Sequence, residues 1–183
     1  MPQLSLDDIQ AGAERARQGG GLPPVERWDP PLSGDIDIRI ARDGTWYHEG
    51  GAINRLELVR LFSGLLKRED DQYYLVTPEE KWRIQVEDAP FVIVALERKV
   101  DAAGTQQLVF ATNVGDQVIA GPDHPLRVVE TATRGTAPYL LVRRNLEGLL
   151  SRPVYYQLVE IAEPAPDGDG YGVASGGIFH RLG

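Results

Sequence analysis

Alternation of apolar and polar residues is the most regular pattern in this chain. In "DIDIRI" (35–40) isoleucines alternate with charged residues, and "KWRIQVE" (81–87) alternates in the same way. A period of two places the apolar side chains on one face, so both segments are predicted to be half-buried strands. "FVIVALE" (91–97) is apolar on both faces, which is typical of a central strand. Further strands are predicted at "TWYHEG", "YYLVT", "QLVFAT", "DQVIAG", "LRVVET", "PYLLV", "PVYYQLVEIA" and "GVASGGIF".

Two segments have the spacing of an amphipathic helix. "LSLDDIQAGAERARQGGG" (4–21) predicts a short N-terminal helix, with Ser5 as its N-cap and Asp8 three residues later. The main helix is predicted over about 54–68, with Asn54 as N-cap and Glu57 at the capping-box position. One long helix among many strands indicates an α+β fold and not an alternating parallel sheet.

Parts of the chain resemble one another. "RDGTWYHEGGAINR" (42–55) and "NVGDQVIAGPDHPLR" (113–127) carry two glycines at the same spacing, and "YLV" (74–76) resembles "YLL" (139–141). "PFVIVALE" (90–97) resembles "PVYYQLVE" (153–160). These similarities predict an internal duplication, in which residues 35–97 and 106–162 form two similar β-rich units. The helix near 54–68 is expected only in the first unit.

The predicted elements suggest three regions. Residues 1–34 would form the N-terminal helix and a proline-rich arm, residues 35–100 a first α+β lobe, and residues 101–183 a second β-rich lobe. The boundary is placed at the turn "DAAGTQ" (101–106), where the apolar pattern stops.

Several of these strings, in this order, resemble the bacterial family catalogued as domain of unknown function 1285 (DUF1285). They are "DIDIRIARDGTWYHEGGAINR", "LVRLF", "YYLVTPEEKWRIQVEDAPF", "TNVGDQVIAGPDHPLR" and "RPVYYQLVE". The resemblance covers roughly residues 24–181 and implies a two-lobed α+β protein whose lobes share a β-rich motif. It also implies a role in signalling or regulation, suggested for the family without a known ligand. It supplies no catalytic residues.

Composition and charge narrow the classes of function. The chain is 42% hydrophobic and 25% charged, which is ordinary for a globular protein. Its net charge of −8 would repel a phosphate backbone, so no nucleic-acid partner is expected. The longest apolar runs are too short to span a membrane, and the first residues lack a signal peptide, so a soluble cytoplasmic protein is expected. Without cysteine there is no disulfide and no thiolate chemistry.

The stretch "GDQVIAGPDHP" gathers Asp116, Asp123 and His124, which could suggest a metal site or an acid/base pair. Metal sites need three or four converging ligands, and His124 has no second histidine at i+2, i+3 or i+4. Asp and Pro also favour turns on their own account. We therefore predict a polar turn, with no metal, no cofactor and no catalytic residue.

Two other motifs are weak. "VASGGIF" resembles the Ser-Gly-Gly of serine proteases, but Ser175 has no histidine in a recognisable motif, and a glycine bulge in the last strand is the preferred interpretation. "DGDGYG" (167–172) resembles the start of a calcium loop, yet Ile178 stands at the twelfth position, where a glutamate is required.

A set of polar residues beside turns and strand ends remains as candidate ligand-binding or inter-lobe residues. It comprises Arg55, Asp88, Asn113, Asp116, His124, Arg127 and Arg143. We expect Arg55, Arg127 and Arg143 to pair with Asp88, Asp116 or Glu160 and so to fix the geometry of the lobes. Beside Arg127 the group could also offer a site to a small anion or polar ligand, since guanidinium groups suit carboxylates and phosphates.

The leading hypothesis for function is a non-enzymatic binding or regulatory protein, with an unknown small molecule or protein as partner. The alternative is a hydrolase-type enzyme that uses Asp116 and His124 at an inter-lobe cleft. A third reading is a structural subunit of a larger complex.

Overall fold

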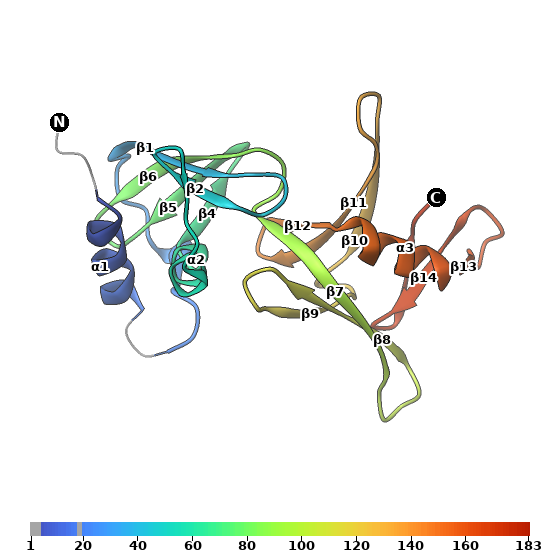
Figure 1. The fold of residues 1–183 in the computed structure, drawn as a ribbon. Coiled ribbons are helices and arrows are strands. Elements are labelled where there is room, and N and C mark those ends of the chain that lie inside the picture. Colours follow the sequence, from blue (N-terminus) through green and yellow to red (C-terminus); the bar gives the residue numbers. More distant parts are fainter. Residues whose placement is uncertain (1–4, 18–19) are drawn as a thin grey trace. The chain divides into compact units, whose positions relative to one another are not determined.

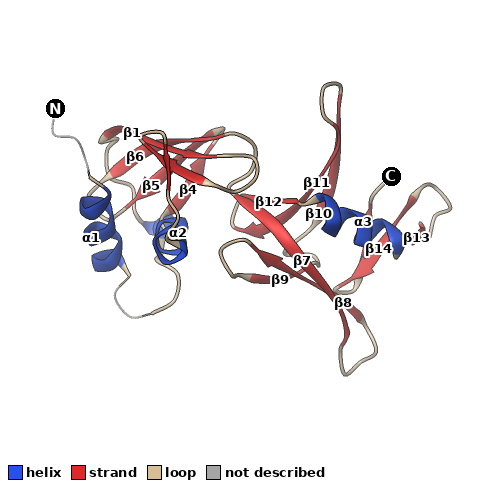
Figure 2. Cartoon of the chain, in the orientation of Figure 1, coloured by secondary structure: helices blue, strands red, loops and turns tan. Residues whose placement is uncertain are grey.

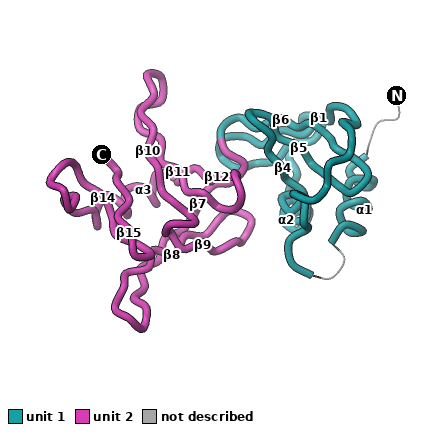
Figure 3. Tube along the Cα trace, turned by 180° about the vertical axis from the view of Figure 1, so that it is seen from behind, with its two compact units in different colours: residues 1–88 teal, residues 89–183 magenta. Residues whose placement is uncertain are grey.

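The computed structural model describes residues 5–17 and 20–183 (Figures 1 and 2). The predicted mixed α+β fold with two β-rich lobes is confirmed. Two six-stranded sheets and a small three-stranded sheet are accompanied by three helices within the described ranges. The chain separates into two compact units, residues 1–88 and residues 89–183 (Figure 3).

Unit 1 is built on one six-stranded sheet with the order β3-β2-β1-β6-β5-β4. Its strands are β1 (Gly34–Ile40), β2 (Trp46–His48), β3 (Gly51–Ala52), β4 (Leu66–Glu69), β5 (Gln72–Val76) and β6 (Lys81–Val86). The isoleucines of the alternating β1 segment follow its predicted inward face, since Ile38 and Ile40 are buried. A 3-10 turn, η1 (Val25–Arg27), precedes the sheet.

Two helices belong to unit 1, α1 (Leu6–Ala16) and α2 (Leu56–Ser63). Phe62 of α2 faces Trp46 of β2, with ring centroids 6.4 Å apart, so the apolar stripe of α2 covers the sheet. In α1 the residues that pack inward are Ile9 and Ala13, four positions apart on one face. Helix α1 thus buries two side chains, while α2 is part of the core.

Unit 2 holds the second six-stranded sheet, with the order β10-β11-β12-β7-β8-β9. Its strands are β7 (Phe91–Val100), β8 (Gln106–Thr112), β9 (Gln117–Ile119), β10 (Leu126–Thr131), β11 (Gly135–Arg143) and β12 (Leu146–Leu150). The β7–β8 and β10–β11 hairpins both extend beyond the rest of this sheet (Figure 1). The large buried side chains of the sheet include Phe91, Ile93, Leu108, Phe110, Leu140 and Leu146.

Helix α3 (Arg152–Glu160) and a small sheet complete unit 2 (Figure 2). The small sheet consists of β13 (Glu163–Pro164), β14 (Tyr171–Ser175) and β15 (Ile178–Arg181). The two-residue turn between β14 and β15 contains Gly176 (φ 63°) and Gly177 (φ 84°). Two consecutive positive φ values suit a tight hairpin, so the glycine bulge predicted here is instead a turn.

The two large sheets have the same topology. Each unit orders its own strands third, second, first, sixth, fifth, fourth. In each unit the first and sixth strands are the parallel pair, β1 with β6 and β7 with β12, whereas the other pairs are antiparallel. The internal repeat is therefore present, and the repeating segments are β1 to β6 (34–86) and β7 to β12 (91–150).

The register of the repeat differs from the predicted one. The match of "YLV" to "YLL" holds, because both strings lie in the fifth strand of their unit, and Leu66 pairs with Leu75 as Leu126 pairs with Leu140. The match of 90–97 to 153–160 is wrong, because the first segment is a strand and the second is α3.

The match between the glycines of 42–55 and 113–127 gave the wrong register because one turn type recurs in the chain. Gly44, Gly104 and Gly115 have φ values of 91°, 84° and 93°. In each of their turns an amide N–H donates to the carbonyl of the residue four positions later (41 to 45, 101 to 105 and 112 to 116). The turn after β1 corresponds in topology to the turn at Gly104, and not to the one at Gly115 that the sequence comparison selected.

The main helix is also shorter than predicted. It spans α2 (Leu56–Ser63) instead of 54–68, its N-cap is Arg55 with no side-chain cap bond, and Gly64 is its C-cap. Residues 66–69 form β4, since backbone pairing with β5 satisfies their polar groups. The N-terminal helix has the predicted cap, because the Ser5 hydroxyl accepts from the Asp8 N–H (3.1 Å) and the Asp8 carboxylate accepts from the Ser5 N–H (3.1 Å).

The units divide after Asp88 and not after residue 100. The expected boundary falls in the β7–β8 hairpin, because "FVIVALE" is a central strand of the second sheet and not the last strand of the first. β7 lies between β12 and β8 in that sheet.

Candidate functional site

The N-terminal helix, α1, has a polar face on the side of α2. Gln10, Glu14 and Arg17 follow at intervals of four and three residues, which places them along one side of α1 and its C-cap. The Gln10 amide donates to the Glu14 carboxylate across 3.0 Å (Nε2 to Oε1). The capping box at Ser5 fixes the first turn, so these side chains project from an ordered helix.

Arg55 connects the second helix to this face. It has extended backbone angles (φ −80°, ψ 104°) as the N-cap of α2, and its Nη2 donates to Gln10 Oε1 across 3.1 Å. Arg55, Gln10 and Glu14 thus form a chain of hydrogen bonds from α2 to α1 that begins on a cation and ends on an anion.

A cavity of about 490 Å³ lies between α1 and α2. Its walls contain two guanidinium groups, two carboxylates, one amide and two leucines, from Arg17, Arg55, Glu14, Glu57, Gln10, Leu58 and Leu61. Arg55 is one of the candidate residues predicted from sequence. The others were missed, although the spacing of Gln10, Glu14 and Arg17 opposite Ile9 and Ala13 was visible in the sequence.

Asp88, the second candidate in unit 1, has a structural partner. Its carboxylate lies 3.2 Å from Nε of Arg42, and its side chain is only 8% exposed. The preceding residue, Glu87, accepts from the backbone N–H of Arg42 (2.9 Å), which holds the end of β6 against the β1–β2 turn.

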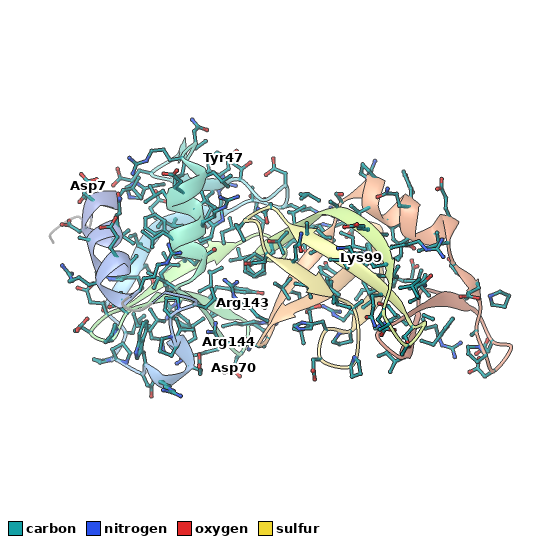
Figure 4. All side chains as sticks on the ribbon, turned by 90° about the horizontal axis from the view of Figure 1, so that it is seen from below. Asp7, Tyr47, Asp70, Lys99, Arg143 and Arg144 are labelled. Atoms are coloured by element: carbon teal, nitrogen blue, oxygen red, sulfur yellow. The ribbon has the colours of Figure 1, made fainter. Side chains whose placement is uncertain are left out.

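The other five candidates lie in unit 2. Arg143 ends β11, next to Arg144 (Figure 4), and its Nη1 donates to Asp116 Oδ2 across 2.9 Å. Its guanidinium also lies 4.9 Å from the ring centre of Phe91. Burial lowers the pKa of Arg143 from its ordinary value, and the Asp116 carboxylate opposes that change. Asp116 thus neutralises a largely buried cation.

Asn113 and His124 bind backbone groups. Asn113 Oδ1 accepts from the Val92 N–H (3.0 Å) while the Asn113 N–H donates to the Val92 carbonyl (2.9 Å), which clamps the turn after β8 to β7. His124 Nδ1 hydrogen-bonds with the carbonyl oxygen of Leu141 across 3.0 Å. Both contacts hold turns against neighbouring strands.

Arg127 is paired with a carboxylate of its own sheet. Its Nε and Nη2 donate to the two oxygens of Glu147 (2.7 and 2.9 Å), and its guanidinium lies 4.7 Å from the centre of the Tyr139 ring. This two-point pairing engages the guanidinium N–H groups that we expected to bind an anion. The expectation that the candidate residues line one junction stays a prediction.

Ser175 and His180 contact each other through the backbone. The Ser175 hydroxyl accepts from the Leu108 N–H (2.9 Å) and donates to the Ala120 carbonyl (2.8 Å). His180 Nδ1 accepts from the Leu126 N–H (3.3 Å), so the proton is on Nε2, which donates to the Ser175 carbonyl (3.2 Å). The hydroxyl and the imidazole are both structural links between the small sheet and the large one.

The loop that resembles a calcium site carries an arginine. Nη2 of Arg181 lies 2.6 Å from Asp167 Oδ2, and Nη1 donates to the Asp169 carbonyl. A backbone bond from Asp169 and the Arg181 side chain lower the pKa of Asp167. Across the described ranges, no three His, Cys, Asp or Glu side chains are grouped to hold a metal ion.

Models of one protein family match both units of the chain. Residues 23–89 match the family model for the N-terminal domain of DUF1285, a domain of unknown function. Residues 90–182 match the model for the C-terminal domain of the same family. The chain belongs to the DUF1285 family. The two matched segments meet within one residue of the boundary between the two compact units, and α1 lies before the first of them.

Two solved members of the DUF1285 family are similar to the chain. A DUF1285 family protein from Silicibacter pomeroyi DSS-3 is 46% identical, with a TM-score of 0.85 over 95% of this chain and 93% of that one. A DUF1285 family protein from Shewanella baltica OS155 is 31% identical, with a TM-score of 0.54 over 67% of this chain and 90% of that one. A search of curated proteins finds no match. Among the described helices, none is long and apolar enough to cross a membrane.

Proposed function

We propose that the protein is a non-enzymatic binding protein that holds a small polar molecule between α1 and α2. The cavity between these helices carries the proposal. Its volume of about 490 Å³ is in the range of small-molecule pockets, roughly 300–1,000 Å³. Its charged walls can bind a ligand by ion pairs and hydrogen bonds.

The position of the cavity supports a regulatory role. Three of its seven lining residues come from α1 and its C-cap, and α1 itself buries only Ile9 and Ala13. A ligand that contacts both helices would stabilise the docked position of α1, because binding shifts an equilibrium toward the state that makes more contacts. The docked position of the N-terminal helix would then depend on whether a ligand occupies the cavity.

The hydrolase alternative rests on Asp116 and His124. Asp116 pairs with Arg143, and His124 binds the Leu141 carbonyl, so each has a partner that accounts for its position. These contacts favour structural roles for both residues, and the binding function is therefore preferred.

A thermal-shift screen tests the proposal. The full chain is heated with a panel of anionic, cationic, zwitterionic and neutral metabolites, with and without divalent metals. We expect at least one compound to raise the melting temperature of the wild type, since binding to the folded state stabilises it. The same compound should have no effect on Arg55→Gln.

Arg15→Gln is the matched control, because Arg15 lies on α1 outside the cavity lining. It should respond like the wild type. A panel without any stabilising compound, or an equal shift in Arg55→Gln, would contradict the proposed site. Metal-dependent stabilisation accompanied by turnover would favour the enzyme instead.

A further inference from the structure

We infer that the cavity between α1 and α2 takes a small zwitterion, of the class of a free α-amino acid with an apolar side chain. This inference rests on the proposed function and names its ligand class. The charges and the apolar surface of the cavity support it.

The cavity is lined by equal numbers of positive and negative side chains. Two guanidinium groups (Arg17 and Arg55) and two carboxylates (Glu14 and Glu57) line the same cavity. An anion without a cationic group would lie close to both carboxylates, and a cation without an anionic group close to both guanidinium groups. These four side chains are exposed, and each can form a charge-assisted hydrogen bond with a group of opposite sign, so a ligand with one group of each sign fits best.

Hydrogen bonds hold the Arg55 side chain in the wall of the cavity. The bond from Arg55 Nη2 to Gln10 Oε1 uses one of the five N–H groups of this guanidinium. Gln10 in turn donates to Glu14, which fixes the amide with its oxygen toward Arg55. Arg55 lines the cavity, and its other N–H groups can bind a carboxylate at two points.

Part of the wall of the cavity is apolar. Leu58 and Leu61, one turn apart on α2, line the same cavity; Leu58 is buried and Leu61 is half-buried, so Leu61 offers most of the apolar surface. Aliphatic surface beside paired charges suits a ligand with a hydrocarbon side chain, because the burial of apolar area stabilises the complex. An α-amino acid with an aliphatic side chain has all three features.

Isothermal titration calorimetry on the full chain tests the class of ligand with four probes. They are L-leucine, N-acetyl-L-leucine (no ammonium), L-leucinamide (no carboxylate) and inorganic phosphate. We expect L-leucine to bind, and each blocked analogue to bind about tenfold more weakly or worse, because each loses a hydrogen bond between charged groups. Phosphate should bind no better than the blocked analogues.

Two variants assign the charges. Arg55→Gln should remove the preference for L-leucine over L-leucinamide, since it removes the partner of the carboxylate. Glu57→Gln should remove the preference for L-leucine over N-acetyl-L-leucine. The controls Arg15→Gln and Glu79→Gln change the same residue types outside the cavity lining and should keep both preferences.

The outcomes separate the two proposals. If N-acetyl-L-leucine or phosphate binds the wild type as tightly as L-leucine does, and Arg55→Gln weakens it, the cavity is an anion site. The ligand class is then wrong while the binding function stands. If none of the four probes binds the wild type, the inferred class is overturned, and the metabolite panel decides the binding function separately.

Discussion

The hydroxyl group of Ser175 joins three separate segments of unit 2. It accepts from the N–H of Leu108 in β8 and donates to the carbonyl of Ala120, and the residue is 1% exposed. Ser175→Ala would leave a buried donor and a buried acceptor without partners. We expect the free energy of unfolding to fall by about 1–3 kcal/mol, measured by urea denaturation.

Thr133→Ala is the control for this substitution. Thr133 is exposed at the tip of the β10–β11 hairpin, and its replacement should change stability by less than about 0.5 kcal/mol. Equal stabilities of the Ser175 and Thr133 variants would show that the hydroxyl does not hold the small sheet in place.

His180 makes stability depend on pH. Burial lowers its pKa, and the bond to the Ser175 carbonyl opposes that change only in part. In the unfolded chain the pKa of a histidine is about 6.5, so around this pH the folded state binds fewer protons than the unfolded state. The contribution of His180 is complete above the unfolded pKa and is lost progressively as the pH falls below it.

Urea midpoints between pH 7 and pH 5 measure this effect. Asn at position 180 keeps an acceptor for the Leu126 N–H but cannot be protonated there, so His180→Asn should flatten the decline on the acidic side. An unchanged slope in the variant would exclude His180 as its cause.

Sequence reasoning located the polar residues better than their partners. The crowding of Asn113, Asp116, His124 and Arg127 in a short stretch was visible, and all four lie in turns or at strand positions of unit 2. Their partners come from distant parts of the chain, for example Glu147 and Arg143, and side chain–side chain pairs of this kind depend on strand order. One sequence cannot supply that order, so Asp116 could be named only as one of three possible partners of the arginines, and the pair of Arg127 with Glu147 was not predicted.

At the level of elements, the packing of β12 against β7 depends on a glycine. A Cβ atom on Gly148 would lie 2.7 Å from Cδ1 of Ile93 and 3.3 Å from Cγ2 of Val142. Gly148→Ala should therefore lower the free energy of unfolding of unit 2 by about 1–3 kcal/mol through overpacking, as measured by urea denaturation.

A compensating substitution tests the cause. Ile93→Val removes Cδ1, the atom closest to the added methyl group, and so relieves the main clash. The double variant should recover part of the stability lost by Gly148→Ala. If the two losses simply add, the clash with Ile93 is not the mechanism.

Helix α3 shows why some elements were predicted wrongly. "RPVYYQLVE" is rich in valine and tyrosine, which favour strands, and it was predicted as a strand on that basis. The residues that are buried are Val154 and Leu158, four positions apart, and Pro153 lies in the first turn, where a helix tolerates it. These helix signals were present but were outweighed by composition. The strictly alternating segments 35–40 and 81–87, by contrast, are the strands β1 and β6.

For the whole molecule, the two units are expected to fold independently. Each has a complete six-stranded sheet with its own buried side chains, and the division lies between residues 88 and 89. Residues 1–88 and 89–183, expressed separately, should each give a strand-rich circular dichroism spectrum and a cooperative thermal transition. A fragment that stays unfolded alone would show that its core depends on the other unit.

The parallel pairing of the first and last strands determines how each unit responds to tension. In unit 1 the chain enters at Gly34, opposite Trp82, and leaves after Val86, opposite Ile40, so entry and exit lie at opposite ends of neighbouring strands. A pulling force on the two ends of the sheet therefore acts along β1 and β6 and shears their hydrogen bonds together, whereas a hairpin pulled from its open end breaks one bond at a time. β7 and β12 are loaded in the same way. In a single-molecule stretching experiment, each large sheet should resist more force when it is pulled from the start of its first strand and the end of its sixth strand than when it is pulled across one of its hairpins.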